Sequence, residues 1–215
     1  MAESTGMSSE TSVFRLCLVT DRDLAGGRAL ADIVAAAVRG GVTMVQLREK
    51  AATGRAFLAQ AQMLKALLAG SGVPLIINDR VDIALAVDAD GVHVGQSDMP
   101  LAQVRALIGV GKIIGLSVTN ASQALQADAA AADYLGIGPV FAQATKADTA
   151  AVLGIDGFAD LRRLARDKPV VAIGGIKAGH ARALRTAGAD GLAVVSAIMA
   201  AADPEAAARA FGQVF

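Results

Sequence analysis

The residues best suited to chemistry in this 215-residue chain stand directly after short apolar runs. One such run ends in Gln46-Leu47-Arg48-Glu49-Lys50. Alternate side chains of an extended segment share a face, so Gln46, Arg48 and Lys50 point one way and Leu47 and Glu49 the other. Two cations on one inward face need an anion to be tolerated. That anion is either a bound substrate or a carboxylate in a salt bridge, such as Glu49.

Two aspartates follow the next two apolar runs, Asp79 directly after Asn78 and Asp98 soon after Gly95. If these runs are neighbouring parallel strands, they lie about 4.8 Å apart. Two carboxylates that close raise each other's pKa unless a cation lies between them. A few oxygen ligands suit Mg²⁺, which keeps waters and accepts substrate phosphate oxygens. The alternative is that each aspartate caps a helix, and Pro100 just after Asp98 also suits a helix start.

Small residues follow the last two apolar runs, where barrel proteins commonly bind phosphate. Gly174-Gly175 ends one run and Ser196 follows the other. Backbone N–H groups of these two loops and of a short helix hold phosphate in many barrels, and glycine lets the backbone approach closely. A bare turn is the alternative at the glycines.

The segment after Ile137 is long for a connection from a strand to a helix. Loops of this kind often act as lids, and this one carries Gln143, Thr145 and Lys146. The alternative is a solvated loop whose lysine has no role. Taken together, the loop, the glycine turn and the Arg48 group predict two separate anion sites. Two such sites suit an enzyme that joins two phosphorylated substrates or holds both ends of a sugar phosphate.

These residues need a scaffold that brings strand ends together. Eight β-branched runs predict strands at Arg15–Thr20, Met44–Arg48, Pro74–Asn78, Gly91–Val94, Ile113–Ser117, Tyr134–Ile137, Pro169–Ile173 and Gly191–Val195. Amphipathic stretches predict helices at Ala29–Arg39, Gly54–Ala69, Val81–Val87, Leu101–Ile108, Ala121–Ala131, Phe158–Arg166, Ala178–Thr186 and Pro204–Phe215. Eight such pairs predict a (β/α)₈ TIM barrel, an α/β fold whose active sites lie where the strands end. An open doubly wound sheet is less suited, because it has fewer strands and a glycine-rich fingerprint after the first.

We expect one domain over residues 13–215, preceded by a disordered tail at 1–12. A weak repeat supports the barrel. Asp88-Ala89-Asp90-Gly91 precedes the fourth predicted strand and Gly188-Ala189-Asp190-Gly191 the eighth, with a fainter echo in Ala131-Ala132-Asp133. In each case a turn of small residues delivers a helix into the next strand.

Composition argues against several classes of protein. The chain has 20 Lys+Arg and 20 Asp+Glu, a formal net charge of zero, which argues against a nucleic-acid or anionic-membrane binder. No stretch approaches the about 20 apolar residues of a membrane span, and the N-terminus lacks the pattern of a secretion signal. The one cysteine, Cys17, cannot form an internal disulfide and suits core packing. We therefore expect a cytoplasmic protein.

The motifs, taken in order, resemble those of thiamine-phosphate synthases. The matching segments are Val19-Thr20-Asp21, Gln46-Leu47-Arg48-Glu49-Lys50, Ile77-Asn78-Asp79, Asp90-Gly91-Val92-His93-Val94-Gly95-Gln96-Ser97-Asp98, Gly115-Leu116-Ser117, Gly136-Ile137-Gly138-Pro139-Val140-Phe141, Thr145-Lys146-Ala147-Asp148, Ile173-Gly174-Gly175-Ile176 and Gly188-Ala189-Asp190-Gly191. They cover the chain after the tail.

The resemblance implies a transferase of thiamine biosynthesis that joins 4-amino-2-methyl-5-hydroxymethylpyrimidine diphosphate to 4-methyl-5-(2-phosphoethyl)thiazole, carboxylated or not, and releases diphosphate. Carried over by position, Gln46, Leu47, Arg48, Glu49, Lys50, Asn78, Ser117 and Lys146 line the pyrimidine diphosphate site, Asp79 and Asp98 hold Mg²⁺, and Gln143, Ala144, Thr145, Gly175, Val195 and Ser196 bind the thiazole phosphate. The catalytic groups are Arg48, Lys50, Lys146 and Ser117. Gln143 departs from the family, which often has Thr there. Barrels of this type often pair, so a homodimer is expected.

Three alternatives remain. A thiazole tautomerase relative would share the barrel without diphosphate chemistry, and a non-catalytic regulator would bind thiamine phosphate without turnover. A sugar-phosphate isomerase would need a placed acid and base. We find no Ser-His-Asp set, and we expect His93 to be a hydrogen-bonded core residue and His180 to lie at an exposed helix start.

Overall fold

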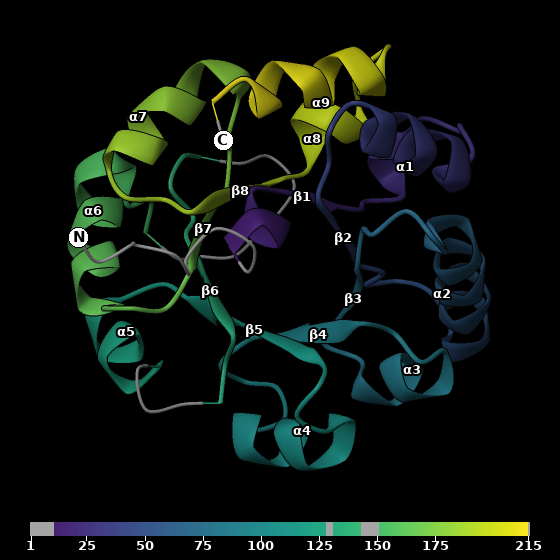
Figure 1. The fold of residues 1–215 in the computed structure, drawn as a ribbon, viewed down its shortest axis with the longest axis horizontal. Coiled ribbons are helices and arrows are strands. Elements are labelled where there is room, and N and C mark those ends of the chain that lie inside the picture. Colours follow the sequence, from purple (N-terminus) through teal and green to yellow (C-terminus); the bar gives the residue numbers. More distant parts are fainter. Residues whose placement is uncertain (1–10, 128–130, 143–150, 215) are drawn as a thin grey trace, which may run out of the picture.

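A ring of eight parallel strands, closed in chain order from β1 to β8, forms the centre of the molecule (Figure 1). The computed structural model describes residues 11–127, 131–142 and 151–214. The strands are β1 Leu16–Val19, β2 Met44–Leu47, β3 Leu75–Asn78, β4 Gly91–Val94, β5 Ile113–Val118, β6 Tyr134–Ile137, β7 Val170–Ile173 and β8 Gly191–Val194. β1 pairs with both β2 and β8, which closes the ring. The predicted (β/α)₈ barrel is confirmed.

The strands are apolar at consecutive positions because both of their faces are buried. Outward side chains such as Val45 and Leu47 join a large core shared with the helices. Inward side chains such as Cys17, Met44 and Tyr134 form a second, smaller core inside the ring. Alternation along each strand therefore assigns every residue to one core or to the other.

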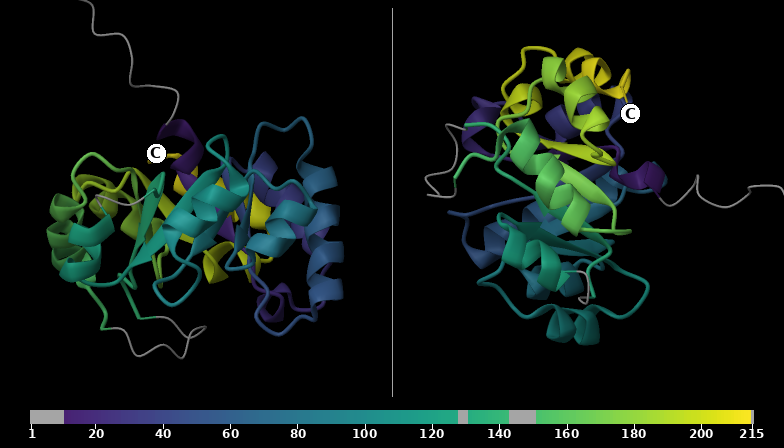
Figure 2. Two further views of the ribbon diagram at one scale, coloured as in Figure 1. Left: turned by 90° about the horizontal axis from the view of Figure 1, so that it is seen from below. Right: turned by 90° about the vertical axis from the view of Figure 1, so that its left-hand side faces the viewer.

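Helices run alongside the strands on the outside of the ring (Figure 2). They are α1 Leu30–Arg39, α2 Gly54–Leu68, α3 Val81–Ala86, α4 Leu101–Ile108, α5 Ala121–Ala127, α6 Gly154–Leu164, α7 Ala181–Thr186, α8 Ser196–Met199 and α9 Pro204–Gly212. Side-chain caps start three of them: Thr53 accepts from the Ala56 N–H at 3.3 Å, Asn120 from the Gln123 N–H at 3.0 Å, and Asp203 from the Ala206 N–H at 3.0 Å. No helix in the described part of the chain is long and apolar enough to cross a membrane.

Several boundaries differ from the sequence prediction. α6 begins at Gly154, one turn before Phe158, and the predicted helix from Ala178 is divided into a 3₁₀ turn, η3 Ala178–His180, and α7. α8 was not predicted as an element, because four residues carry no periodic signal. At the other end of the chain, residues 11 and 12, assigned to the tail, begin a 3₁₀ turn, η1 Thr11–Phe14.

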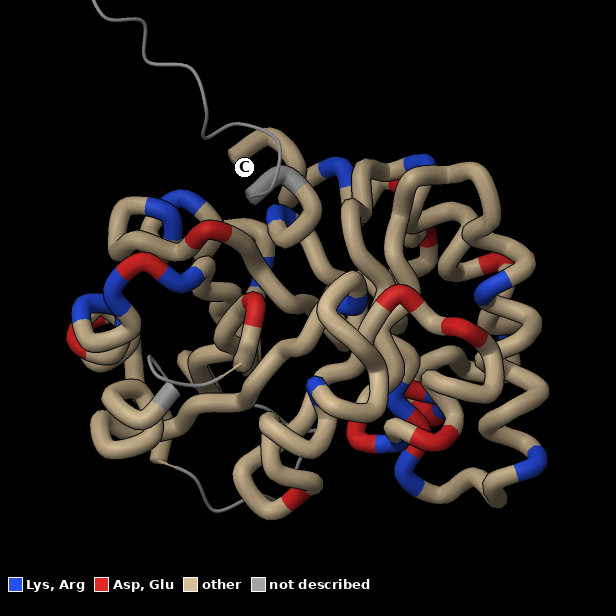
Figure 3. The backbone as a smooth tube through the Cα atoms, turned by 60° about the horizontal axis from the view of Figure 1, so that its bottom comes forward, with Lys and Arg blue, Asp and Glu red and all other residues tan. Residues whose placement is uncertain are grey.

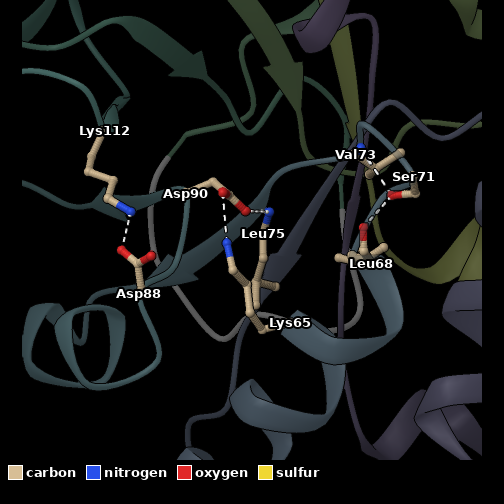
Figure 4. A network of polar contacts seen from close by, with 8 residues as sticks. All are labelled: Lys65, Leu68, Ser71, Val73, Leu75, Asp88, Asp90 and Lys112. Carbon is tan, nitrogen blue, oxygen red and sulfur yellow. Dashed lines mark hydrogen bonds and ion pairs between the residues drawn. The ribbon is translucent and has the colours of Figure 1, made fainter.

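The aspartates of the sequence repeat tie neighbouring strands together at their amino ends. Asp90 accepts from the Leu75 N–H at 2.8 Å, Asp133 from Ile114 at 2.7 Å and Asp190 from Val170 at 2.8 Å. Lys65, Arg105 and Arg162 form ion pairs with these three carboxylates in turn. Figure 4 shows the first case, with Lys65 and the Leu75 N–H both on Asp90. The repeat is thus a structural clamp at the end of the barrel away from the predicted site.

Charges of both signs are interspersed over the molecule in the view of Figure 3, without a face of a single sign.

At the amino ends of the strands, η1 covers the inner core. Phe14 of this turn is buried, and its ring centroid lies 4.9 Å from that of Tyr134. The open end of the barrel is therefore the carboxyl end of the strands.

Candidate active site

A cavity of about 670 Å³ opens where the strands end. Its walls include most of the predicted site residues in the described part of the chain: Gln46, Arg48, Lys50, Asn78, Asp79, Asp98, Ser117 and Val195. A larger hollow of about 900 Å³ lies near the Asp90 clamp, between the ends of α2 and α3, and its lining is mostly Ala, Leu, Gly and Val. The chemistry-bearing residues belong to the cavity at the strand ends, which we take as the candidate active site.

The cations of the β2 end, Arg48 and Lys50, line this cavity. Arg48 and Lys50 form no ion pair within the described residues, so the predicted alternative of a salt bridge with Glu49 is wrong. The Arg48 backbone is fixed, because its N–H donates to the buried Thr20 hydroxyl at 3.0 Å. Two cations at a mouth that form no ion pair within the described residues favour an anionic ligand.

Leu47 and Glu49, both predicted to contact substrate, do not line the cavity. Leu47 is fully buried in the outer core, as alternation along β2 requires. The Glu49 carboxylate lies near Arg22, Asp21 and Asp23; burial raises its pKa, and the positive charge of Arg22 lowers it. Gly175 and Ser196 are likewise outside the cavity lining, and the predicted substrate contacts of these four residues stay predictions.

Asp79 and Asp98 meet at the mouth, as predicted. Burial and then the neighbouring charge of Asp98, with which it shares a hydrogen bond, raise the pKa of Asp79 from 3.8 to about 6. Lys50 and Asn78 act in the opposite direction. Asp79 has a left-handed backbone, φ +63°, which turns the chain sharply from β3 toward α3. The carboxylates therefore face each other across adjacent strand ends.

The capping alternative for these aspartates is wrong. α3 and α4 begin without a side-chain cap. Asp98 instead accepts from the Gly95 N–H at 2.7 Å, within its own turn. No group of three or more His, Cys, Asp or Glu is placed to hold a metal ion in the part of the chain that the structure describes. Two carboxylates with room for further oxygen ligands nevertheless match the donor set that Mg²⁺ takes when waters and substrate phosphates complete its shell.

Ser117 reaches the cavity from β5 and hydrogen-bonds to His93 of β4. The distance from Ser117 Oγ to His93 Nε2 is 2.9 Å, and His93 Nδ1 lies 2.8 Å from the Tyr134 hydroxyl. His93 is the hydrogen-bonded core residue we expected, yet it also lines the cavity. The Ser-His pair itself was not predicted. A tyrosine, rather than a carboxylate, is the third member.

The ends of β7 and β8 form the expected glycine turn. Gly174 and Gly175 both have left-handed backbones, φ +101° and +64°. A Cβ on Gly175 would lie 2.5 Å from the Ala142 carbonyl oxygen, so only glycine fits there. α8 begins at Ser196, and the Gly175 and Ser196 N–H groups donate to no acceptor among the described residues. This is the arrangement of strand ends and short helix that holds phosphate in barrels.

The loop after β6 starts at the same rim. The Val140 and Phe141 N–H groups donate to the Ile173 and Gly174 carbonyls at 2.9 and 3.0 Å, which fixes the start of the loop beside the glycine turn. The predicted residues Gln143, Ala144, Thr145 and Lys146 lie outside the described residues. Their roles remain predictions.

The lining residues that were not assigned to the site from the sequence include the polar residues Asp21, Gln96, Thr119 and Gln123. All follow β1, β4 or β5, so their place after a strand was the available signal. Gln96 donates to the Ser117 carbonyl at 2.6 Å. Gln123 accepts from the Thr119 N–H at 2.7 Å. His180, expected at an exposed helix start, is half-buried and packs on Phe141 with ring centroids 4.0 Å apart.

The barrel mouth has cations on one side and, on the other, the Gly175 and Ser196 N–H groups, which donate to no acceptor among the described residues. This arrangement is typical of one class of protein, the phosphate-binding (β/α)₈ barrels. Comparison with known proteins narrows this class. The family model described as thiamine monophosphate synthase matches residues 16–198. The chain therefore belongs to the thiamine monophosphate synthase family.

Individual relatives agree with the family. The thiamine-phosphate synthase of Albidiferax ferrireducens is 56% identical over 200 residues, which cover 93% of this chain and 91% of the relative. That of Chloroflexus aurantiacus is 54% identical over 196 residues, 91% of this chain and 90% of the relative. The solved structure of thiamine phosphate pyrophosphorylase from Pyrococcus furiosus superposes with a TM-score of 0.86 at 37% identity, over 96% of this chain and 97% of that one.

Proposed function

We propose that this protein is a thiamine-phosphate synthase, which joins the pyrimidine diphosphate to the thiazole phosphate and releases diphosphate. The thiazole nitrogen forms a bond to the pyrimidine methylene carbon, the bond from that carbon to the diphosphate oxygen breaks, and the electron pair leaves with the diphosphate. One observation carries the proposal: Arg48 and Lys50, which form no ion pair within the described residues, and Gly174 of the glycine turn line one cavity, which suits two phosphorylated substrates.

Arg48 and Lys50 are suited to hold the departing diphosphate. At about 4 Å and an effective dielectric near 20, each pair of opposite charges contributes roughly 4 kcal/mol before desolvation. Negative charge on the diphosphate grows as the bond breaks, so these fixed cations stabilise the transition state more than the bound substrate. We expect Lys146 to add a third cation from the loop after β6.

Asp79 and Asp98 would hold Mg²⁺ at the same side of the cavity. When bound, the ion neutralises diphosphate charge and relieves the repulsion between the two carboxylates. Asn78 hydrogen-bonds to Asp79 and so orients the carboxylate. These residues follow β3 and β4, next to β2, so the metal and the cations would meet the same diphosphate.

The thiazole phosphate fits the opposite wall. The Gly175 and Ser196 N–H groups, which donate to no acceptor among the described residues, would bind its phosphate, next to Val195 of the cavity wall. The nucleophile is then the substrate's own ring nitrogen, and the protein only has to place it in line with the breaking bond.

The test is incubation of the full chain with both phosphorylated substrates, with Mg²⁺ or with EDTA. Thiamine phosphate is measured by mass and diphosphate by a coupled assay. We expect both products, in equal amounts, in the presence of Mg²⁺. Isomerised thiazole without diphosphate release would identify a tautomerase, and binding of thiamine phosphate without turnover would identify a regulator. Equal rates in EDTA and in Mg²⁺ would contradict the metal site.

A further inference from the structure

A buried row of polar side chains lies behind Ser117. His93 bonds to Ser117 Oγ through Nε2 at 2.9 Å and to the Tyr134 hydroxyl through Nδ1 at 2.8 Å. His93 is 6% exposed and Tyr134 only 1%, whereas Ser117 reaches the cavity. The row therefore connects the inner core of the barrel with the substrate site.

Strand register builds this row. His93 of β4 is paired with Gly115 of β5, which is paired with Tyr134 of β6. A Cβ on Gly115 would lie 2.3 Å from both His93 Nδ1 and the Tyr134 ring, so the two side chains can meet across β5 only because residue 115 is glycine. Ser117, two residues further along β5, points to the same side as the row.

The direction of the hydrogen bonds decides what Ser117 can do. A neutral imidazole offers one N–H and one acceptor nitrogen. If Tyr134 donates to Nδ1, then Nε2–H donates to Ser117, and the Ser117 proton is free for the cavity. In the reverse direction Ser117 donates to His93, and the Tyr134 proton needs another acceptor.

The surroundings of Tyr134 favour the first direction. Burial raises the pKa of Tyr134 well above 10, so its hydroxyl keeps its proton. Gln46 also lies near this hydroxyl. His93 Nδ1 lies 2.8 Å from the Tyr134 oxygen and, in a neutral ring, can accept its proton. A buried hydroxyl proton needs an acceptor, which favours donation from Tyr134 to Nδ1.

We propose that His93 is a positioning residue that donates to Ser117 Oγ and so turns the Ser117 hydroxyl proton toward an acceptor atom of the bound pyrimidine diphosphate. This step rests on the proposed function. A diphosphate offers only acceptors, so Ser117 must donate in order to bind it. The same direction separates this pair from a Ser-His nucleophile, because an Nε2 that carries a proton cannot accept the serine proton.

The first test reads the tautomer directly and needs no turnover. The chain has two histidines, so ¹⁵N spectra of the labelled full chain at pH 8 resolve both imidazole rings, and His93→Gln assigns the His93 signals. We expect a proton on Nε2 and none on Nδ1. A ring protonated at Nδ1 overturns the proposal, even if the protein makes thiamine phosphate. If instead the protein lacks synthase activity, the tautomer still shows in which direction the hydrogen bonds between Tyr134, His93 and Ser117 are donated.

The second test is a double-mutant cycle with Ser117→Ala. His93→Leu should lower kcat about 10-fold in the wild-type background, the effect of one misdirected hydrogen bond, and less than about 2-fold in the Ser117→Ala background. His93→Gln, whose amide can still donate, should restore most of the loss. Equal losses in both backgrounds would show that His93 only supports the fold and would overturn the proposal. If His93→Leu does not fold, Tyr134→Phe replaces it, and its effect must likewise vanish with Ser117→Ala.

Discussion

Replacing Asp79 with Asn should stabilise the metal-free protein while it impairs the proposed metal site. The pKa of Asp79 rises from 3.8 to about 6 on folding, mainly through burial and the Asp98 charge. This shift formally corresponds to about 3 kcal/mol. Asp79 is exposed at the mouth, so solvent screening reduces the expected gain to about 1 kcal/mol. Asn tolerates the left-handed backbone of this position well.

The sign follows from proton binding. Between pH 3.8 and about 6 the folded carboxyl binds its proton more tightly than the unfolded one, so wild-type stability falls as the pH rises through this window. The advantage of Asp79→Asn should be absent near pH 4 and complete at pH 8. Any gain from the backbone preference of Asn alone would not depend on pH.

Urea unfolding in EDTA at pH 4.5, 6 and 8 measures this difference, with Asp82→Asn as the matched control. Asp82 lies three residues further on, and a hydrogen bond from Arg80 lowers its pKa, so its replacement should be neutral or destabilising at pH 8. Mg²⁺ should then raise the unfolding midpoint of the wild type but not that of Asp79→Asn. A gain equal at every pH, or no gain at pH 8, would refute the argument that the two carboxylates repel each other.

Three further predictions follow from other parts of the site and core. Gly175→Ala should raise the KM for the thiazole phosphate at least about 10-fold, whereas Gly70→Ala, also left-handed but with open space around it, should not; equal KM values would place the phosphate elsewhere. Lys146→Ala should lower kcat about 10²–10³-fold with the protein still folded, and an unchanged kcat would remove Lys146 from the mechanism. Burial raises the pKa of Cys17 from 9.0 to about 12, so stability should fall by about 1 kcal/mol between pH 9 and 10 as the unfolded thiol ionises. Cys17→Ala should lose this slope in urea unfolding between pH 9 and 10, and an unchanged slope would contradict the assignment to Cys17.

Most of the fold could be predicted because the signals are local. Strands buried on both faces are apolar at consecutive positions, and each one here is followed by a helix, which leaves few architectures open. The element ends were less predictable. α6 begins at Gly154, a glycine with φ +66° that is hydrogen-bonded to the start of the loop after β6, and that bond between distant residues has no local pattern. α8 has only four residues, too few for a periodic signal.

The same distinction applies to the site. The positions of Arg48, Lys50, Asp79 and Asp98 after consecutive strands were sufficient to predict that they meet. The contact of Leu47 with substrate, which the motif predicts, stays a prediction for its backbone atoms, because the alternation along β2 directs its side chain into the outer core.

Ser117, His93 and Tyr134 show what such reasoning could not find. Each residue had an ordinary interpretation on its own, a strand end or a core position. Their connection depends on the register of three strands and on a glycine between them, because any side chain at residue 115 would separate His93 from Tyr134. The glycine of Gly115-Leu116-Ser117, which in the sequence looks like part of a family motif, is thus the physical condition for the hydrogen bond that orients Ser117. Replacing Gly115 should therefore change catalysis by disturbing the hydrogen bond that orients Ser117, although residue 115 does not itself contact the substrate.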